Sequence, residues 1–95
     1  MIRSFADREA EALFFSRFAR RLPMDIQRAA QRKLQQLHAA EEVRDLAAPP
    51  GNRLEALRGS PAGQHSIRIN DQWRLCFIWK DGAAELVEIV DYHQG

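Results

Sequence analysis

The stretch QHSIRINDQWRLCFIW, residues 64–79, is the most informative part of the sequence, because polar and apolar side chains alternate along two strand-like runs. Its large apolar residues all fall at odd positions: Ile67, Ile69, Trp73, Leu75, Phe77 and Trp79. The even positions hold Ser66, Arg68, Arg74 and Cys76. A two-residue loop would pair odd positions with even ones and mix the two faces. A three-residue loop over residues 70–72 pairs odd with odd, so the stretch predicts an antiparallel hairpin with one apolar face.

Further strands flank this hairpin. The run AAELVEIVDYH, residues 83–93, follows a turn and has the composition of a strand. The run RLEAL, residues 53–57, could be a short strand that begins after the loop-forming segment AAPPGN. Near the N-terminus, IRSF at residues 2–5 is short and β-prone. The second half of the chain is therefore predicted to be a meander of about four strands.

Two amphipathic helices precede these strands. Asp7 is a candidate N-cap, and apolar residues at helical spacing predict a helix over about residues 7–20. That apolar stripe consists of Ala10, Leu13, Phe14 and Phe18. Pro23 restarts the chain, and a second stripe predicts a helix that ends near Ala39. Helices first and strands after indicate an α+β fold, with the helix pair packed on one face of a small, mainly antiparallel sheet.

Length and composition limit the class of protein. The chain has 95 residues, 45% of them apolar, which predicts a single domain over residues 1–95. Cys76 is the only cysteine, which excludes an intrachain disulfide and fits a reducing compartment. Neither a secretory signal nor an apolar run long enough to span a membrane is present. We therefore expect a soluble, cytoplasmic protein.

Arginines gather around the predicted hairpin. The net charge is only +1, but four arginines face two acids between residues 53 and 74: Arg53, Arg58, Arg68 and Arg74 against Glu55 and Asp71. Arg68 and Arg74 should lie on adjacent strands of the non-core face, where Arg74 is expected to add little packing. They would repel each other unless an anion lies between them. That anion could be a structural carboxylate, such as Glu55 or Asp91, or a substrate phosphate.

The last strand leads directly into Asp91, Tyr92 and His93. Histidine titrates near neutral pH, tyrosine can donate a hydrogen bond, and aspartate can orient histidine or accept a proton, so these residues could serve general acid–base chemistry. The alternative is structural: Tyr92 caps the core edge, Asp91 pairs with an arginine and His93 is solvated. Two other histidines have packing or capping interpretations, His65 on the apolar parity of its strand and His38 near a helix C-terminus.

Three stretches together carry a family resemblance: NRLEALRG at residues 52–59, GQHSIRINDQWRLCF at 63–77 and VEIVDYH at 87–93. They resemble the HigB branch of the RelE/ParE toxin superfamily, including its GraT-like members. The resemblance implies a RelE-like fold and cleavage of mRNA in the A site of the small ribosomal subunit, with no metal ion or other cofactor. It also implies a HigA-type helix-turn-helix antitoxin as partner, which alone would contact operator DNA, and no membrane partner.

The resemblance also assigns roles to individual residues. Arg74 matches the arginine expected to contact the scissile phosphate, and the terminal Asp91, Tyr92 and His93 match positions implicated in catalysis. Arg58 stands where many relatives have lysine. Arg53 and Arg68 are less regular in the family or not matched by it, and we expect them to join Arg58 in RNA binding as part of the basic patch.

Glu55 departs from the family pattern, because several relatives have histidine there. It could act as base for the ribose 2′-hydroxyl, with His93 as acid, or it could be the ion-pair partner of an arginine, leaving proton transfer to Asp91 and His93. The departure keeps two other functions open: a ParE-like inhibitor of DNA gyrase, and a binding module without catalytic activity.

Overall fold

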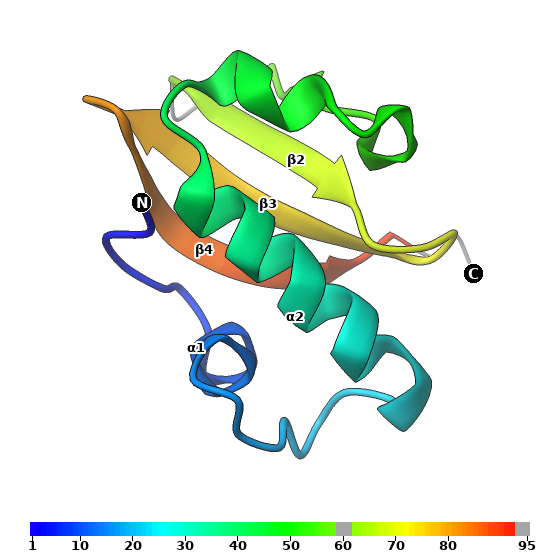
Figure 1. Cartoon of the computed structure of the whole chain (residues 1–95). Helices are drawn as coiled ribbons and strands as arrows, with labels where there is room; N and C mark the ends of the chain where they lie inside the picture. The colour runs from blue at the N-terminus through cyan, green and yellow to red at the C-terminus, as the bar shows by residue number, and fades with distance from the viewer. Residues whose placement is uncertain (59–61, 93–95) are drawn as a thin grey trace.

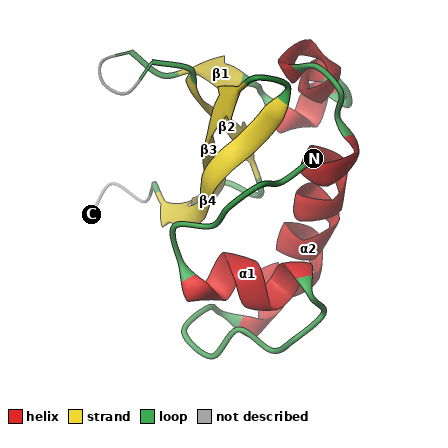
Figure 2. Cartoon of the chain, turned by 90° about the vertical axis from the view of Figure 1, so that its left-hand side faces the viewer, coloured by secondary structure: helices red, strands yellow, loops and turns green. Residues whose placement is uncertain are grey.

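A four-stranded antiparallel sheet, in the order β1-β2-β3-β4, forms one layer of the molecule, and the helices form the other (Figure 1). The computed structural model describes residues 1–58 and 62–92. The helical elements are α1 (Arg8–Phe14), α2 (Met24–Ala39) and two 3₁₀ helices, η1 (Val43–Ala47) and η2 (Pro50–Asn52). The strands are β1 (Glu55–Ala56), β2 (Gln64–Arg68), β3 (Trp73–Lys80) and β4 (Ala83–Asp91). Because α1 and α2 lie on the same side of the sheet (Figure 2), the predicted α+β fold is confirmed.

The β2–β3 hairpin has the predicted register. Arg68 pairs with Arg74 and Ile67 with Leu75, so residues 70–72 form the three-residue loop. Asn70 stabilises this loop, since its Oδ1 accepts hydrogen bonds from the backbone N–H groups of Gln72 (2.9 Å) and Trp73 (2.8 Å). The odd positions face the helices, and Ile67 and Leu75 are completely buried. The even positions therefore face away from the helix layer.

The first helix is shorter than predicted. Asp7 caps it as expected, accepting a hydrogen bond from the N–H of Ala10 at 2.6 Å, but the helix ends at Phe14 rather than near residue 20. Ser16 takes a left-handed backbone conformation (φ 60°), which the helix cannot continue through. Phe18 consequently leaves the apolar stripe and is 61% exposed. The predicted place of Phe18 in that stripe was wrong.

The second helix and the N-terminal segment match their predicted positions. The helix α2 runs from Met24 to Ala39 and buries its apolar stripe on β3 and β4. Ile2 and Phe5 form isolated parallel bridges to β4, which confirms the β character of the first residues. His38 lies in the last turn of α2, near the helix C-terminus as expected. Its Nδ1 accepts a hydrogen bond from the backbone N–H of Ile2 at 3.1 Å and fixes the N-terminal segment.

The short strand β1 is held in place from the helical side by a buried asparagine. The Nδ2 group of Asn52 donates to the carbonyl oxygens of Leu46 (3.1 Å) and Ala48 (3.3 Å), and Lys33 donates to its Oδ1. After this anchor the chain turns at Arg53 (φ 45°), and Glu55 pairs with Ser66. The predicted strand over residues 53–57 is thus reduced to two residues, whose position depends on η1 and η2.

The strand β4 brings the end of the described chain beside the β2–β3 loop. Leu86 (φ 51°) marks a bulge, where the register against β3 shifts between Cys76 and Ile78. Beyond it, Asp91 pairs with Trp73, and the N–H of Tyr92 donates to the carbonyl oxygen of Gln72 at 2.6 Å. Among the described residues, none of the helices has the length and apolar character needed to cross a membrane.

Candidate active site

Arg74 is the centre of a polar cluster on the sheet face that turns away from the helices. Its Nε donates to the Ser66 hydroxyl at 2.8 Å, and its Nη2 donates to the carbonyl oxygens of Arg53 (2.7 Å) and Ser66 (3.3 Å). Only 8% of the residue is exposed. The expectation that Arg74 would add little packing was wrong, because β1 and the turn at Arg53 cover it.

Glu55 supplies the carboxylate that pairs with Arg74. Its Oε1 lies 3.1 Å from Arg74 Nη2, and 58% of the Glu55 side chain is exposed against 10% of the Arg74 side chain. The carboxylate is therefore at the solvent side of the guanidinium, where an incoming anion would approach. Glu55 is thus a structural carboxylate that pairs with Arg74, one of the two carboxylates named above as candidates.

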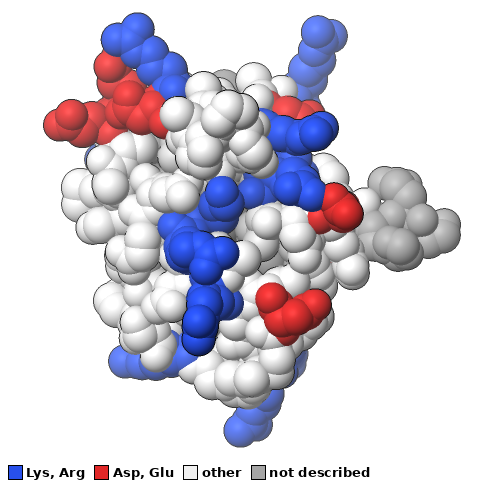
Figure 3. Space-filling view, turned by 45° about the vertical axis from the view of Figure 1, so that its right-hand side comes forward, with Lys and Arg blue, Asp and Glu red and all other residues white. Residues whose placement is uncertain are grey.

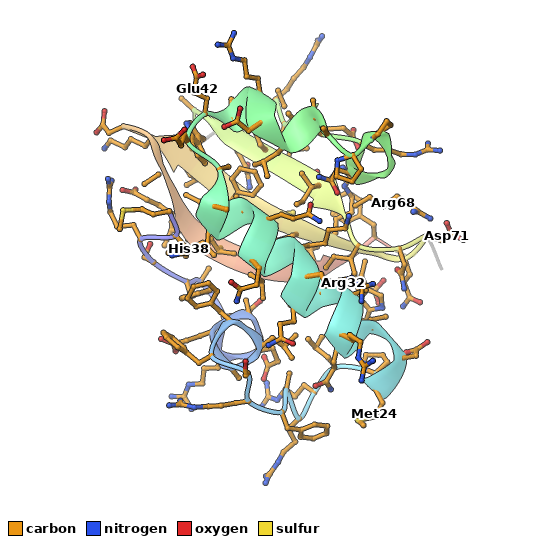
Figure 4. The ribbon with its side chains drawn as sticks, in the orientation of Figure 1. Met24, Arg32, His38, Glu42, Arg68 and Asp71 are labelled. Atoms are coloured by element: carbon orange, nitrogen blue, oxygen red, sulfur yellow. The ribbon has the colours of Figure 1, made fainter. Side chains whose placement is uncertain are left out.

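Arg68 does not share that carboxylate. It forms a close ion pair with Asp71 in the hairpin loop, and the two labelled side chains lie close together in Figure 4. The Asp71 side chain is 98% exposed, so the pair is open to solvent. Arg68 and Arg74 therefore sit opposite each other across β2 and β3, each with its own carboxylate partner.

Tyr92 completes the cluster from the end of β4. Its ring centroid lies 5.8 Å from Arg74 Cζ, a cation–π distance, and its hydroxyl is 3.8 Å from the Cys76 sulfur. Burial is the main cause that raises the pKa of Tyr92 and the pKa of the Cys76 thiol above their ordinary values. Tyr92 is therefore a neutral hydrogen-bond donor at neutral pH, while Asp91 beside it accepts a hydrogen bond from Gln72 Nε2 at 3.1 Å.

These side chains line a cleft of about 500 Å³, which we call the arginine cleft. Its lining residues are Arg53, Glu55, Arg68, Asn70, Asp71, Arg74 and Tyr92. Figure 3 views the molecule from between the helix side and the right-hand edge of Figure 1, and Lys and Arg side chains form a band on this neighbouring surface. Positive charge, a phenol and a carboxylate in one open cleft suit a polyanionic substrate with a reacting phosphate.

The structure brings together only some of the residues predicted for the site. Arg53, Glu55, Arg68, Arg74 and Tyr92 meet in the arginine cleft, whereas Arg58 is exposed and does not line it. Asp91 precedes Tyr92 at the rim but is not part of the lining. His93 lies outside the described residues. Within those residues, no group of three or more His, Cys, Asp and Glu side chains could hold a metal ion.

Sequence reasoning missed two groups that hold Arg74. The alternation of faces along the hairpin could have indicated the Ser66 hydroxyl, since Ser66 occupies an even position on the same face as Arg68 and Arg74. The carbonyl oxygen of Arg53 gave no such signal, because it depends on the left-handed turn that follows η2. The prediction that His65 is a packing residue is confirmed, because its ring stacks on Phe77 with centroids 6.1 Å apart.

Comparison with known proteins agrees with this fold. The family model of the RelE-like toxin of the type II toxin–antitoxin system HigB matches residues 3–93. The chain is 51% identical over 65 residues to Toxin HigB-1 of Vibrio cholerae, an alignment that covers 68% of each chain. It is 31% identical over 94 residues to Endoribonuclease HigB of Proteus vulgaris, which covers 98% of this chain and 100% of that one.

The chain belongs to the HigB-like family of RelE-like toxins. The resemblance seen in the hairpin and in the terminal residues is thereby confirmed, and an antitoxin partner follows from the type II system.

Proposed function

We propose that this toxin is a ribosome-dependent endoribonuclease, which cleaves mRNA by attack of a ribose 2′-hydroxyl on the adjacent phosphorus. The observation that carries the proposal is Arg74, whose guanidinium is held at the base of the arginine cleft by Ser66 and Arg53. The Proteus vulgaris relative is named an endoribonuclease, which supports the same activity here. The products would be a 2′,3′-cyclic phosphate and a 5′-hydroxyl.

Arg74 would stabilise the negative charge that develops on the phosphoryl oxygens. Its hydrogen bonds fix the guanidinium before the substrate arrives, so little reorganisation is needed in the transition state. Arg53 and Arg68 at the rim would bind the phosphates on either side of the cut, and Arg58 would extend this contact outside the cleft. The neutral Tyr92 hydroxyl would donate a hydrogen bond to a phosphoryl oxygen.

Glu55 would serve as the counter-ion of Arg74 in the resting toxin. Its exposed carboxylate occupies the approach to the guanidinium and would give way to the scissile phosphate. Proton transfer would then fall to the residues at the end of the chain, with Asp91 near the attacking hydroxyl and His93 near the leaving 5′-oxygen. Requiring a 2′-hydroxyl makes the reaction specific for RNA.

The partners follow from this activity. The toxin, as one domain over residues 1–95, would act in the cytoplasm at the A site of the small ribosomal subunit, with mRNA as substrate. A HigA-type helix-turn-helix antitoxin would neutralise it, and operator DNA would be bound only through that antitoxin. The type II system supports an antitoxin of this kind.

The proposal is tested by mapping the 5′ ends of transcripts after brief induction of the toxin in growing cells. We expect new 5′-hydroxyl ends inside translated regions for the wild type and few for Arg74→Lys, which keeps the charge but loses the planar fork. Arg44→Lys is the matched control, because the Arg44 side chain is 80% exposed, pairs with Glu42 at 3.1 Å and does not line the arginine cleft. Growth arrest without new ends, or gyrase-dependent DNA breaks in their place, would contradict the proposal.

A further inference from the structure

The guanidinium of Arg74 has a buried side and a solvent side. On the buried side, Nε donates to the Ser66 hydroxyl and Nη2 donates to the Arg53 carbonyl. On the solvent side is the half-exposed Glu55 carboxylate. The buried contacts come from backbone and from a fully buried side chain, whereas Glu55 can move into solvent. When an anion arrives, the buried contacts can therefore stay in place, while the Glu55 carboxylate can leave the guanidinium.

Ser66 has the geometry of a fixed support. It lies on β2 between its strand partners Glu55 on β1 and Cys76 on β3, and none of its surface is exposed. Cys76 is two residues beyond Arg74 on the same face, so the Arg74 side chain reaches diagonally to the serine hydroxyl. A hydroxyl buried between two strands has few alternative positions. It can therefore determine the rotation of the guanidinium plane.

This support leaves one edge of the guanidinium for the substrate. Within the described part of the chain, Nη1 makes no hydrogen bond, while Nε and Nη2 are held by Ser66 and Arg53 and Nη2 also pairs with the displaceable Glu55 carboxylate. A fork fixed on one side presents its remaining N–H groups in a defined direction. Charge stabilisation in a transition state depends on such direction, and a displacement of about 1 Å can cost about 100-fold in rate.

We propose that Ser66 is a positioning residue, whose hydroxyl aligns the free edge of Arg74 with the scissile phosphate. The proposal rests on the function proposed above, because it acts through the role of Arg74 in cleavage. It adds a specific requirement: the rate should depend on the Ser66 hydroxyl only while residue 74 has an Nε–H group that can donate to it.

The test is a double-mutant cycle between residues 66 and 74. Cleavage of a defined mRNA bound to purified ribosomes is measured for the wild type, Ser66→Ala, Arg74→Lys and the double variant. We expect Ser66→Ala to lower kcat by about 10- to 100-fold and to change KM by less than about threefold. In the Arg74→Lys background, which lacks Nε–H, the same change should cost less than about threefold.

Ser4→Ala is the matched control, because Ser4 Oγ also accepts one hydrogen bond, from the N–H of Leu86 at 2.9 Å, and Ser4 does not line the arginine cleft. It should leave kcat within about twofold of the wild type. Should Ser66→Ala fail to fold, Ser66→Cys keeps the side-chain size with a weaker acceptor and should give an intermediate kcat.

Several results would overturn the positioning role. One is an unchanged kcat for Ser66→Ala, and another is an equal loss of kcat for Ser4→Ala. A third is that Ser66→Ala lowers kcat by the same factor in the Arg74→Lys background as in the wild type. Ser66→Cys would overturn it too if it cleaved as fast as the wild type. The failure of the proposed function looks different: the wild type itself would then leave the ribosome-bound mRNA uncut.

Discussion

At the scale of single residues, Arg74 is a buried charge whose desolvation is offset by specific partners. The Ser66 hydroxyl and the Arg53 carbonyl oxygen accept hydrogen bonds from it, the Glu55 carboxylate forms an ion pair with it, and the Tyr92 ring lies beside it. Removing one member of such a buried set leaves the others without a hydrogen-bond partner, which costs more than the net gain from the intact set. Arg74 is thus both a structural residue and the proposed catalytic one.

We expect Arg74→Ala to lower the free energy of unfolding by about 1–3 kcal/mol, because it leaves buried acceptors unsatisfied. Arg44→Ala, at an exposed position, should stay within about 0.5 kcal/mol of the wild type. Denaturant titration of the three proteins measures both values. Equal stability of Arg74→Ala and the wild type would show that the buried contacts of Arg74 do not support the fold.

Glu55→Gln separates the two roles considered for Glu55. A counter-ion is only partly needed for cleavage, and glutamine keeps an oxygen that can accept from Arg74, so we expect kcat to stay within about tenfold of the wild type. A general base would instead contribute about 10²- to 10⁴-fold. Single-turnover cleavage of ribosome-bound mRNA measures the difference. A loss of 100-fold or more would reassign Glu55 as the base.

The Cys76 thiol should make stability depend on alkaline pH. Burial raises the pKa of this thiol in the folded state above its ordinary value of 9.0, so the unfolded chain loses the proton first. The contribution to stability is therefore complete below pH 9.0 and is lost as pH rises toward the raised folded value. Between about pH 9 and 10, before the ordinary pKa of Tyr92 is reached, Cys76→Ala should show a flatter pH dependence of unfolding. Identical slopes for the two proteins would refute this.

At the scale of elements, the hairpin was predictable and the end of the first helix was not. Alternation in residues 64–79 fixed the three-residue loop, because only one register buries all the odd positions. The end of α1 depends on the turn at Ser16, which α2 stabilises from a distance: Gln31 Nε2 donates to the Ser16 hydroxyl at 2.7 Å. Gln27 in α2 holds the following segment through the carbonyl oxygens of Ala19 (2.8 Å) and Leu22 (3.0 Å). Local periodicity contains no information on such tertiary contacts.

Gly63 should be required at the start of the β2–β3 pair. Its φ of 81° lies in the left-handed region, and an added Cβ would come within 2.6 Å of the Trp79 carbonyl oxygen. We expect Gly63→Ala to lower the free energy of unfolding by about 2 kcal/mol or more, from left-handed strain of about 1–2 kcal/mol and the clash. Thermal or denaturant unfolding reports the change.

Gly51 provides the matched control. A Cβ there would meet nothing within 4 Å, and its backbone is not left-handed, so Gly51→Ala should be neutral or stabilising by up to about 1 kcal/mol. A Gly63→Ala variant as stable as Gly51→Ala would mean that the strand end adapts to a side chain without cost.

At the scale of the whole molecule, the helices leave one face of the sheet free for the arginine cleft. The cleft collects residues from β1, β2, β3, the β2–β3 loop and the end of the described chain. The alternation of faces predicted that Arg68 and Arg74 share one side of the sheet, and the local charge pointed to Arg53 and Glu55 near them. They did not predict that Glu55 would pair with Arg74 while Arg68 pairs with Asp71. That division depends on where β1 docks, which in turn follows from the buried Asn52.

The arginine cleft is proposed to direct a ribose 2′-hydroxyl onto the neighbouring phosphate. The most direct measurement compares two mRNAs on purified ribosomes, identical except that one carries a single 2′-deoxynucleotide on the 5′ side of the cut. We predict that wild-type toxin cleaves the all-RNA message to a 2′,3′-cyclic phosphate and leaves the deoxy-substituted bond intact. Cleavage of the substituted bond at an equal rate would contradict the claim.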